Sequence, residues 1–295
     1  MDEIALELGF RPGRRSAALL FALFAGGVGC FNAVQALAWF AQPELYPLLH
    51  ALSWAGWFFW QGVLFPRARE RALASAGGSA YAAVFCSNIW PGVCWGFSHM
   101  TLPVALGLLS GLSHDSARLT AGFLAAGLGA TLMGTAFRTI GFARAGFLSE
   151  YRPVHAPIRQ SKIYAFMRHP LFVGGALLSV GCTLGLGTHT ELLIAAVNVL
   201  ILPVYQAVED RRLVRVFGET YADYIRAVGG IAPRPEQLGR LIAQGARFVA
   251  AYRQRLAASG RFALGRQHGE VELAGAAGHG SRRRPATMAA VVQEA

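Results

Sequence analysis

Charged residues are scarce in this chain. Only 15% of its 295 residues are Asp, Glu, Lys or Arg, whereas a typical soluble domain carries about 25%. Lysine is nearly missing, because Lys162 is the only lysine among 27 basic residues. Hydrophobic residues, in contrast, make up 54% of the chain and gather in long runs. This composition excludes an ordinary soluble domain and predicts an integral membrane protein.

Cysteine is also rare, and its placement gives no sign of a metal centre. The chain has four cysteines, each in an apolar segment and without the spacing of metal ligands. Free cysteine is among the residues most often buried, so we interpret the four as small packing residues and expect no metal ion.

The net charge of +11 does not indicate a nucleic acid partner. The arginines lie in the loops between apolar segments and in the C-terminal tail. The positive-inside rule expects basic residues at these places in a membrane protein.

Six apolar segments are each near the ~17–25 residues that a helix needs to cross a bilayer. The third is the weakest, because Asn88 and Pro91 interrupt it. The first is longer than the ~7–15 residues of a signal-peptide core, which favours an uncleaved anchor. The segments are 16–40, 46–65, 79–98, 118–138, 171–187 and 191–208. They predict an all-α fold, a polytopic transmembrane helical bundle of about six spans.

The basic residues predict how this bundle is oriented. The loops at 66–78 and 138–170 are rich in arginine, whereas the linkers at 41–45, 99–117 and 188–190 contain neither arginine nor lysine. The positive-inside rule therefore places the arginine-rich loops and both termini in the cytoplasm. A chain rich in Ala, Gly and Arg is typical of a GC-rich bacterial genome, so we expect a bacterial inner membrane.

The sequence divides into four parts. Residues 1–117 form the N-terminal transmembrane part, and residues 118–235 carry the last three spans and the polar motifs. Residues 236–258 alternate apolar residues with arginine, a pattern typical of an amphipathic basic helix on an anionic membrane surface. Residues 259–295 are rich in Gly, Ala and Arg without a pattern and are predicted to be disordered.

Two polar clusters flank the last apolar hairpin. Arg168 and His169 stand directly before Pro170, which is suited to the first turn of a helix because its missing N–H has no partner there. Glu209 and Asp210 close the returning segment. Two antiparallel spans of similar length bring both clusters to one depth at the cytoplasmic face. Ionisable groups at a membrane face are costly and usually functional, which indicates a site.

These residues carry a resemblance to a known family. The stretch from about Leu128 to Pro235 resembles the isoprenylcysteine carboxyl methyltransferase and phospholipid methyltransferase superfamily of integral membrane enzymes. Phe172 stands where the family pattern usually has Tyr, and Asp210 where it has a second Glu. The matching residues are Tyr164, Arg168, His169, Pro170, Phe172, Gly174, Glu209, Asp210, Leu213, Phe217, Gly218, Tyr221 and Tyr224. The segment 136–141 also looks like the part of the family that precedes this motif.

The resemblance implies S-adenosyl-L-methionine as the cofactor, bound at the cytoplasmic face between the last two spans and the following loop. Arg168 or His169 would bind its carboxylate and Glu209 its amino group, because such a zwitterion needs both charges. The cofactor-binding set that we predict is Tyr164, Arg168, His169, Pro170, Gly174, Glu209, Asp210, Tyr221 and Tyr224.

The acceptor is expected to be a lipid or another hydrophobic molecule that enters from the bilayer. Arg168 or Arg138 would hold a carboxylate acceptor, and His169 would serve as the base for a thiol or an amine. Three catalytic residues are thus predicted: Arg138, Arg168 and His169.

Two other functions stay open at this point. Sterol-type membrane reductases carry a related His-Pro motif and bind a nicotinamide cofactor, although they usually have more spans. A membrane protein that kept the fold without catalysis is the second alternative. Tyr221 and Tyr224 would then serve as interfacial anchors.

Overall fold

The computed structural model describes residues 1–110, 115–152, 161–186 and 189–240, with a few positions beyond. The chain divides into two units, Met1–Leu238 and Gly239–Ala295, and the fold below is that of the first. Most of the predicted surface helix at 236–258 and the whole predicted tail at 259–295 lie outside the described residues.

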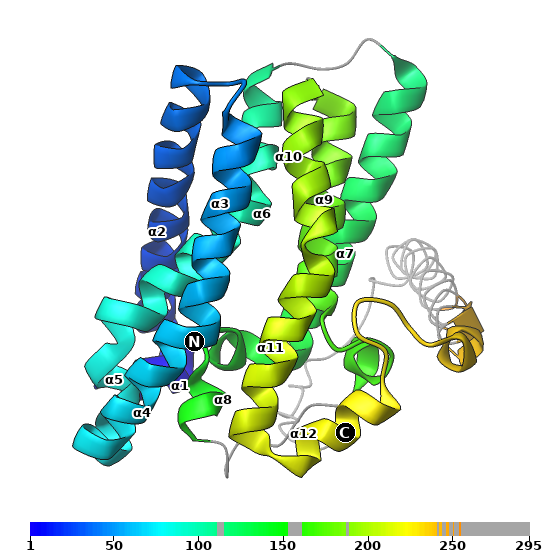
Figure 1. Ribbon diagram of the computed structural model, residues 1–295. Coiled ribbons are helices and arrows are strands. Elements are labelled where there is room, and N and C mark those ends of the chain that lie inside the picture. Colours follow the sequence, from blue (N-terminus) through cyan, green and yellow to red (C-terminus); the bar gives the residue numbers. More distant parts are fainter. Residues whose placement is uncertain are drawn as a thin grey trace, which may run out of the picture. The chain divides into compact units, whose positions relative to one another are not determined.

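The fold is all-α, as predicted (Figure 1). Throughout the described part of the chain the regular elements are helices, and a single isolated bridge joins Met167 to Gly229. The N-terminal half contains α1 (Asp2–Glu7), α2 (Arg14–Ala41), α3 (Tyr46–Phe59), η1 (Trp60–Leu64), α4 (Phe65–Ala76), η2 (Gly77–Ser79), α5 (Ala80–Val84), η3 (Phe85–Ile89) and α6 (Trp90–Ser110). The C-terminal half contains α7 (Ser116–Ala145), α8 (Leu148–Tyr151), η5 (Lys162–Ala165), α9 (Pro170–Leu186), α10 (His189–Leu200), α11 (Leu202–Phe217) and α12 (Glu219–Ala227).

Several of these helices are long and apolar enough to cross a membrane. In the described ranges four stretches meet this condition, and α9 is a shorter apolar helix beside them. The four stretches are Arg14–Ala41, Tyr46–Leu109, Ser116–Ala145 and His189–Phe217. All six predicted spans are helical except at two positions: Ile201 in the sixth lies between α10 and α11, and Gly187 at the end of the fifth lies outside the described residues.

The boundary predicted for the third span was wrong. Its helix does not end at residue 98, because α6 continues to Ser110 with Pro103 inside it. The stretch Tyr46–Leu109 reverses direction between α4 and α5 (Figure 1), where Gly77 has φ of +50°, a conformation that glycine adopts easily. The polar Asn88 and Pro91, which appeared to weaken this span, lie near its start.

Close backbone contact joins α7 to α9. A Cβ atom placed on Gly122 would lie 2.6 Å from the backbone nitrogen of Gly185, and one on Gly174 would lie 2.8 Å from the carbonyl oxygen of Gly129. Gly134 has no atom within 4 Å of such a Cβ, so it does not share this contact. The packing face therefore follows the 3.6-residue helical period and not the four-residue spacing of Gly122, Ala126, Ala130 and Gly134 along α7.

A buried polar network connects the apolar helices. The amide of Asn198 on α10 accepts from the indole nitrogen of Trp54 at 2.8 Å and lies 2.9 Å from Nε2 of His50. The same amide donates to the carbonyl oxygen of His99 at 2.9 Å and to Ser179 Oγ at 3.2 Å. One side chain thereby joins α3, α6, α9 and α10, and hydrogen bonds of this kind stabilise helix association within a bilayer.

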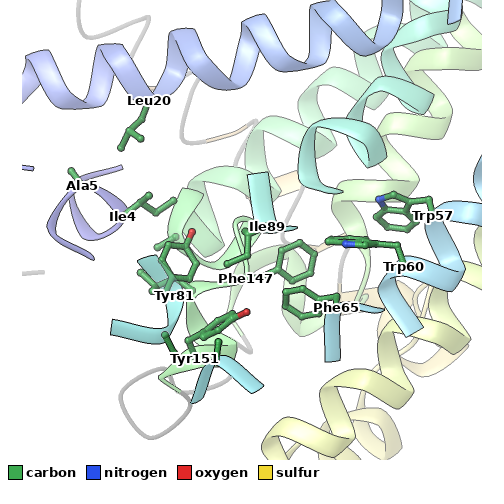
Figure 2. Packing of buried hydrophobic residues seen from close by; sticks show 14 of the residues in the cluster. Ile4, Ala5, Leu20, Trp57, Trp60, Phe65, Tyr81, Ile89, Phe147 and Tyr151 are labelled. Carbon is green, nitrogen blue, oxygen red and sulfur yellow. The ribbon is translucent and has the colours of Figure 1, made fainter. Parts of the chain in front are cut away.

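An aromatic core fills the space beside the polar motifs (Figure 2). The ring of Phe147, just before α8, lies 4.8 Å from that of Phe65 and 6.0 Å from that of Trp60. Phe147 has φ of +63°, which few residues other than glycine adopt. Its packing against Phe65 holds this turn and fixes the start of α8.

The contact between α7 and α9 can be tested with two alanine substitutions in α7. Alanine normally stabilises a helix relative to glycine by about 1 kcal/mol. Gly122→Ala should nevertheless lower the melting temperature in detergent by several degrees, because the new methyl group meets the backbone of Gly185 and overpacking costs about 1–3 kcal/mol. Gly127→Ala is the matched control, since no atom lies within 4 Å of its Cβ position, and an equal loss in both variants would contradict this account.

Candidate functional site

The segment before α9 is attached to the segment after α12. The backbone N–H of Arg168 donates to the carbonyl oxygen of Gly229 at 2.8 Å, and that of His169 donates to Gly230 at 3.3 Å. These bonds fix the backbone at the two residues that precede Pro170. The side chains of Arg168 and His169 are thereby directed toward α11.

Asp210 is the centre of the polar cluster. Its carboxylate accepts from Nη2 and Nε of Arg168 at 2.8 and 3.3 Å, and from the hydroxyl of Tyr221 at 3.0 Å. Its Oδ1 atom also lies 3.0 Å from Nε2 of His169. The two-point pairing with Arg168 is a strong form of carboxylate recognition. The predicted meeting of the two polar clusters at one depth therefore occurs in the fold.

The guanidinium of Arg168 is fully engaged within the protein. Its Nη1 atom donates to the carbonyl oxygens of Ile225, at 3.2 Å, and Val228. Together with the bonds to Asp210, these contacts tie α9, α11 and the end of α12 to one cation. Arg168 therefore helps to hold the site together, through guanidinium nitrogens that already have partners within the protein.

His169 bridges two carboxylates. Its Nδ1 atom lies 2.9 Å from Oε2 of Glu209, and its Nε2 atom faces Asp210. Burial by itself lowers the pKa of His169, but the hydrogen bonds to Asp210 and Glu209 outweigh it, so that the pKa is raised. An imidazolium that donates from both nitrogens fits this arrangement. The ring of Tyr205 lies edge-on to it at 5.5 Å.

A second group of charges adjoins the first through Glu209. Its Oε1 atom accepts from Nη2 of Arg212 at 3.3 Å, while Nη1 of Arg212 lies 3.1 Å from Oε1 of Glu150. The guanidinium of Arg212 lies 4.4 Å from the ring centre of Phe147 and 5.4 Å from that of Phe65, a cation–π arrangement.

Glu150 and Arg212 were not predicted from the sequence. A usable signal was present, because Glu150 is the single acidic residue in the basic segment 138–170. Burial raises the pKa of Glu150 to about 7, although Arg212 and Arg69 oppose the rise. A carboxyl group with such a pKa is often found at functional sites.

Both groups of charges border one cavity of about 160 Å³. Its lining has a polar part and an apolar part. The polar part includes Gln61, Arg144, Ser149, Glu150, Tyr164, Arg168, His169, Tyr205, Glu209, Arg212, Tyr221 and Tyr224. The apolar part includes Trp57, Val93, Gly96, Phe97, Ile140, Ala145, Phe147, Leu171, Phe172, Leu213 and Phe217.

Only some of the predicted site residues line the cavity. Six of them line the cavity: Tyr164, Arg168, His169, Glu209, Tyr221 and Tyr224. Asp210 lies behind this lining, and Pro170 begins α9. Gly174 packs against Gly129 of α7, so its lack of a side chain serves helix packing.

Arg138 is not brought to the cavity. Its side chain is exposed on α7 and does not belong to the cavity lining. The helical turn that carries it presents Ala136 and Thr139 inward, and both are buried. The ring of Phe172, which stands where the family pattern has Tyr, stacks on that of Tyr205 at 3.5 Å.

The helices and the cavity define a polytopic all-α membrane protein with a buried ionic cluster beside an apolar chamber. Residues 117–220 match the family model for phospholipid methyltransferases. This segment thus belongs to the superfamily of membrane methyltransferases that also includes the isoprenylcysteine carboxyl methyltransferases, and the resemblance seen in the sequence is confirmed. No curated protein and no solved structure matches the chain. The chain is an integral membrane protein that carries a membrane methyltransferase domain.

The central position of Asp210 can be tested by removing its carboxylate. Asp210→Ala leaves the buried charges of Arg168 and His169 without this partner, and breaking a buried ion pair typically costs about 3–5 kcal/mol. We expect a large loss of thermal stability in detergent. Asp223→Ala is the control, because its pair with Arg226 is exposed and is worth about 0–1 kcal/mol. Similar melting temperatures for the two variants would disprove the central place of Asp210.

The raised pKa of Glu150 predicts a pH dependence of stability. The folded protein retains this proton up to about pH 7, whereas the ordinary pKa is 4.5. The stability that Glu150 contributes is therefore full below pH 4.5 and is lost as the pH rises through about 7. Glu150→Gln should remove this decline. The measurement is the difference between the melting temperatures of the wild type and the variant from pH 4 to 8, and a difference that does not change with pH would refute it.

Proposed function

We propose that this protein transfers the methyl group of S-adenosyl-L-methionine to a lipid-like or small hydrophobic acceptor at the cytoplasmic face of the membrane. One observation carries this proposal. Within the family-matched segment, the side chains of His169 and Glu209 meet at 2.9 Å on the polar side of a cavity whose lining also has an apolar part. A charged cofactor and an apolar acceptor both find suitable surfaces there.

The residues at the cavity suit this cofactor. Its amino-acid end carries an ammonium and a carboxylate, and the lining supplies both carboxylates and arginine side chains. Its adenosine needs apolar or aromatic surface, which Tyr164, Tyr221 and Tyr224 offer. When bound, the cofactor supplies an activated methyl group, and the protein contributes positioning and exclusion of water.

The contacts assign different parts to the predicted residues. In this proposal Arg168 and Asp210 act as positioning residues, because their hydrogen bonds hold three helices together. Glu209 and the tyrosines contact the ligands directly. His169 acts as a base only after it has lost the proton that the two carboxylates hold on it. Arg138 takes no part, because its side chain does not reach the cavity.

The proposed setting is a bacterial inner membrane with both termini in the cytoplasm. This orientation rests on the arginine-rich loops at 66–78 and 138–170. The four-part division of the chain fits the same proposal, with residues 1–117 on the side of the acceptor and residues 118–235 as the methyltransferase core. The acceptor atom is a carboxylate oxygen, a thiol sulfur or an amine nitrogen.

Binding of S-adenosylhomocysteine tests this function directly. The purified protein in detergent should bind it in a calorimeter, and Glu209→Gln should weaken binding by about 10–100-fold, as expected for a lost hydrogen bond to a charged group. Glu219→Gln is the control, because Glu219 is exposed on α12. Saturable binding of NADPH without binding of S-adenosylhomocysteine would instead establish the reductase. Binding of neither by a folded wild type would leave a non-catalytic protein.

A further inference from the structure

Three buried side chains at the cavity have polar atoms without hydrogen-bond partners in the described structure. They are Gln61 Oε1, Glu150 Oε2 and Nε of Arg212, whereas Nη1 of Arg212 lacks a hydrogen bond but is ion-paired with Oε1 of Glu150 at 3.1 Å. Their residues are only 1%, 2% and 3% exposed. Buried polar groups are nearly always paired, so an unpaired group needs an explanation. All three side chains line the same cavity.

In the neighbouring cluster around Asp210, the buried polar atoms have hydrogen-bond partners. Both nitrogens of the His169 ring face carboxylates. The guanidinium of Arg168 bonds Asp210 and two carbonyl oxygens. None of these side chains has an unpaired buried nitrogen or oxygen among the residues that the structure describes. Within the polar lining, the unpaired atoms are thus confined to one part, and six further side chains elsewhere in the described structure also have one.

The elements that carry the three side chains pack against one another. A Cβ on Gly62, the residue after Gln61, would lie 3.7 Å from the side chain of Val208 on α11. Arg69 of α4 donates from Nε to the carbonyl oxygen of Glu150 at 2.7 Å. The guanidinium of Arg212 lies against the rings of Phe65, the first residue of α4, and Phe147, the residue before α8. The subsite is therefore built from η1, α8 and α11.

The chemistry of the unpaired atoms specifies a ligand. The oxygen of Gln61 accepts hydrogen bonds, as does Glu150 once it has lost its proton, and the resulting carboxylate favours a cationic donor. The Nε atom of Arg212 is a donor, and a guanidinium favours an oxyanion. A ligand that satisfies both sets carries an ammonium and an oxyanion close together. Such a zwitterion adds no net charge to a buried site, which keeps the cost of burial low.

We propose that Gln61, Glu150 and Arg212 form a subsite that binds a zwitterionic headgroup, with its ammonium at Gln61 and Glu150 and its oxyanion at Arg212. This inference rests on the proposed function and assigns residues to one part of that site. The headgroup has two sources: the amino-acid end of the cofactor, or the phosphoethanolamine end of a lipid acceptor.

The subsite also gives the N-terminal half of the chain a part in binding. Gln61 lies outside the family-matched residues 117–220. The proposed function places the acceptor on the side of residues 1–117. Gln61 is a specific residue of that half whose buried amide reaches the cavity.

The test compares ligands with and without the headgroup. Gln61→Leu and Glu150→Gln are measured by calorimetry against S-adenosylhomocysteine and 5′-methylthioadenosine, which lacks the amino-acid end. A second arm uses short-chain phosphatidylethanolamine and phosphatidylcholine, whose quaternary ammonium has no N–H to donate. Glu70→Gln is the matched control, because Glu70 is exposed on α4. Gln61→Leu breaks no ion pair, so it keeps the test informative if Glu150→Gln unfolds.

Each outcome decides the proposal. If the variants bind S-adenosylhomocysteine about tenfold or more weakly than the wild type and bind methylthioadenosine equally well, the result supports the subsite and the cofactor as its ligand. If only the affinity for phosphatidylethanolamine falls by this amount, the result supports the subsite with the lipid as the source of the headgroup. The proposal is overturned if the variants bind all four ligands as the wild type does. It is also overturned if S-adenosylhomocysteine and methylthioadenosine lose affinity equally and phosphatidylethanolamine and phosphatidylcholine lose affinity equally. A folded wild type that binds neither adenosine ligand refutes the proposed function instead, and the lipid arm then decides the subsite separately.

Discussion

The site depends on the buried pairing of Asp210 with Arg168 and His169. Arg168 joins Asp210 on α11 to the carbonyl oxygens of Ile225 and Val228, and His169 joins Asp210 to Glu209. These charges lie where water is largely excluded, so each must be matched by its neighbours. Meeting that requirement fixes how the start of α9, the middle of α11 and the end of α12 are arranged around the cavity.

Two kinds of polar group result from this constraint. Arg168, His169 and Asp210 satisfy one another, which makes them suited to holding the helices. Glu209 connects them to Arg212 and Glu150, two residues of the cavity lining that have buried polar atoms without hydrogen-bond partners. A fully satisfied cluster is rigid, whereas an unsatisfied one gains hydrogen bonds when a ligand arrives. In the function that we propose, the first group positions and the second binds.

Much of the fold was predictable because its signals are local. Long apolar runs identified the helices, and Pro170 marked the beginning of α9. The end of the third span was misplaced, because the apolar residues of α6 continue past a histidine and a proline that resemble a loop. The small-residue face on α7 was less predictable than the helices themselves. Its true members depend on which residues of α9 lie opposite, and a single helix does not specify them.

The sequence by itself determined that the chain is helical, that it spans a membrane, and that Arg168, His169, Glu209 and Asp210 belong to one family motif. It could do so because apolar length and motif spacing are properties of the chain alone. Only the tertiary structure decided what each charge does. Arg168 turned inward to Asp210, Arg138 stayed on an exposed face, and Gln61, Glu150 and Arg212 met from three distant segments. Hydrogen bonds and burial depend on neighbours in space, and distance along the chain does not reveal them.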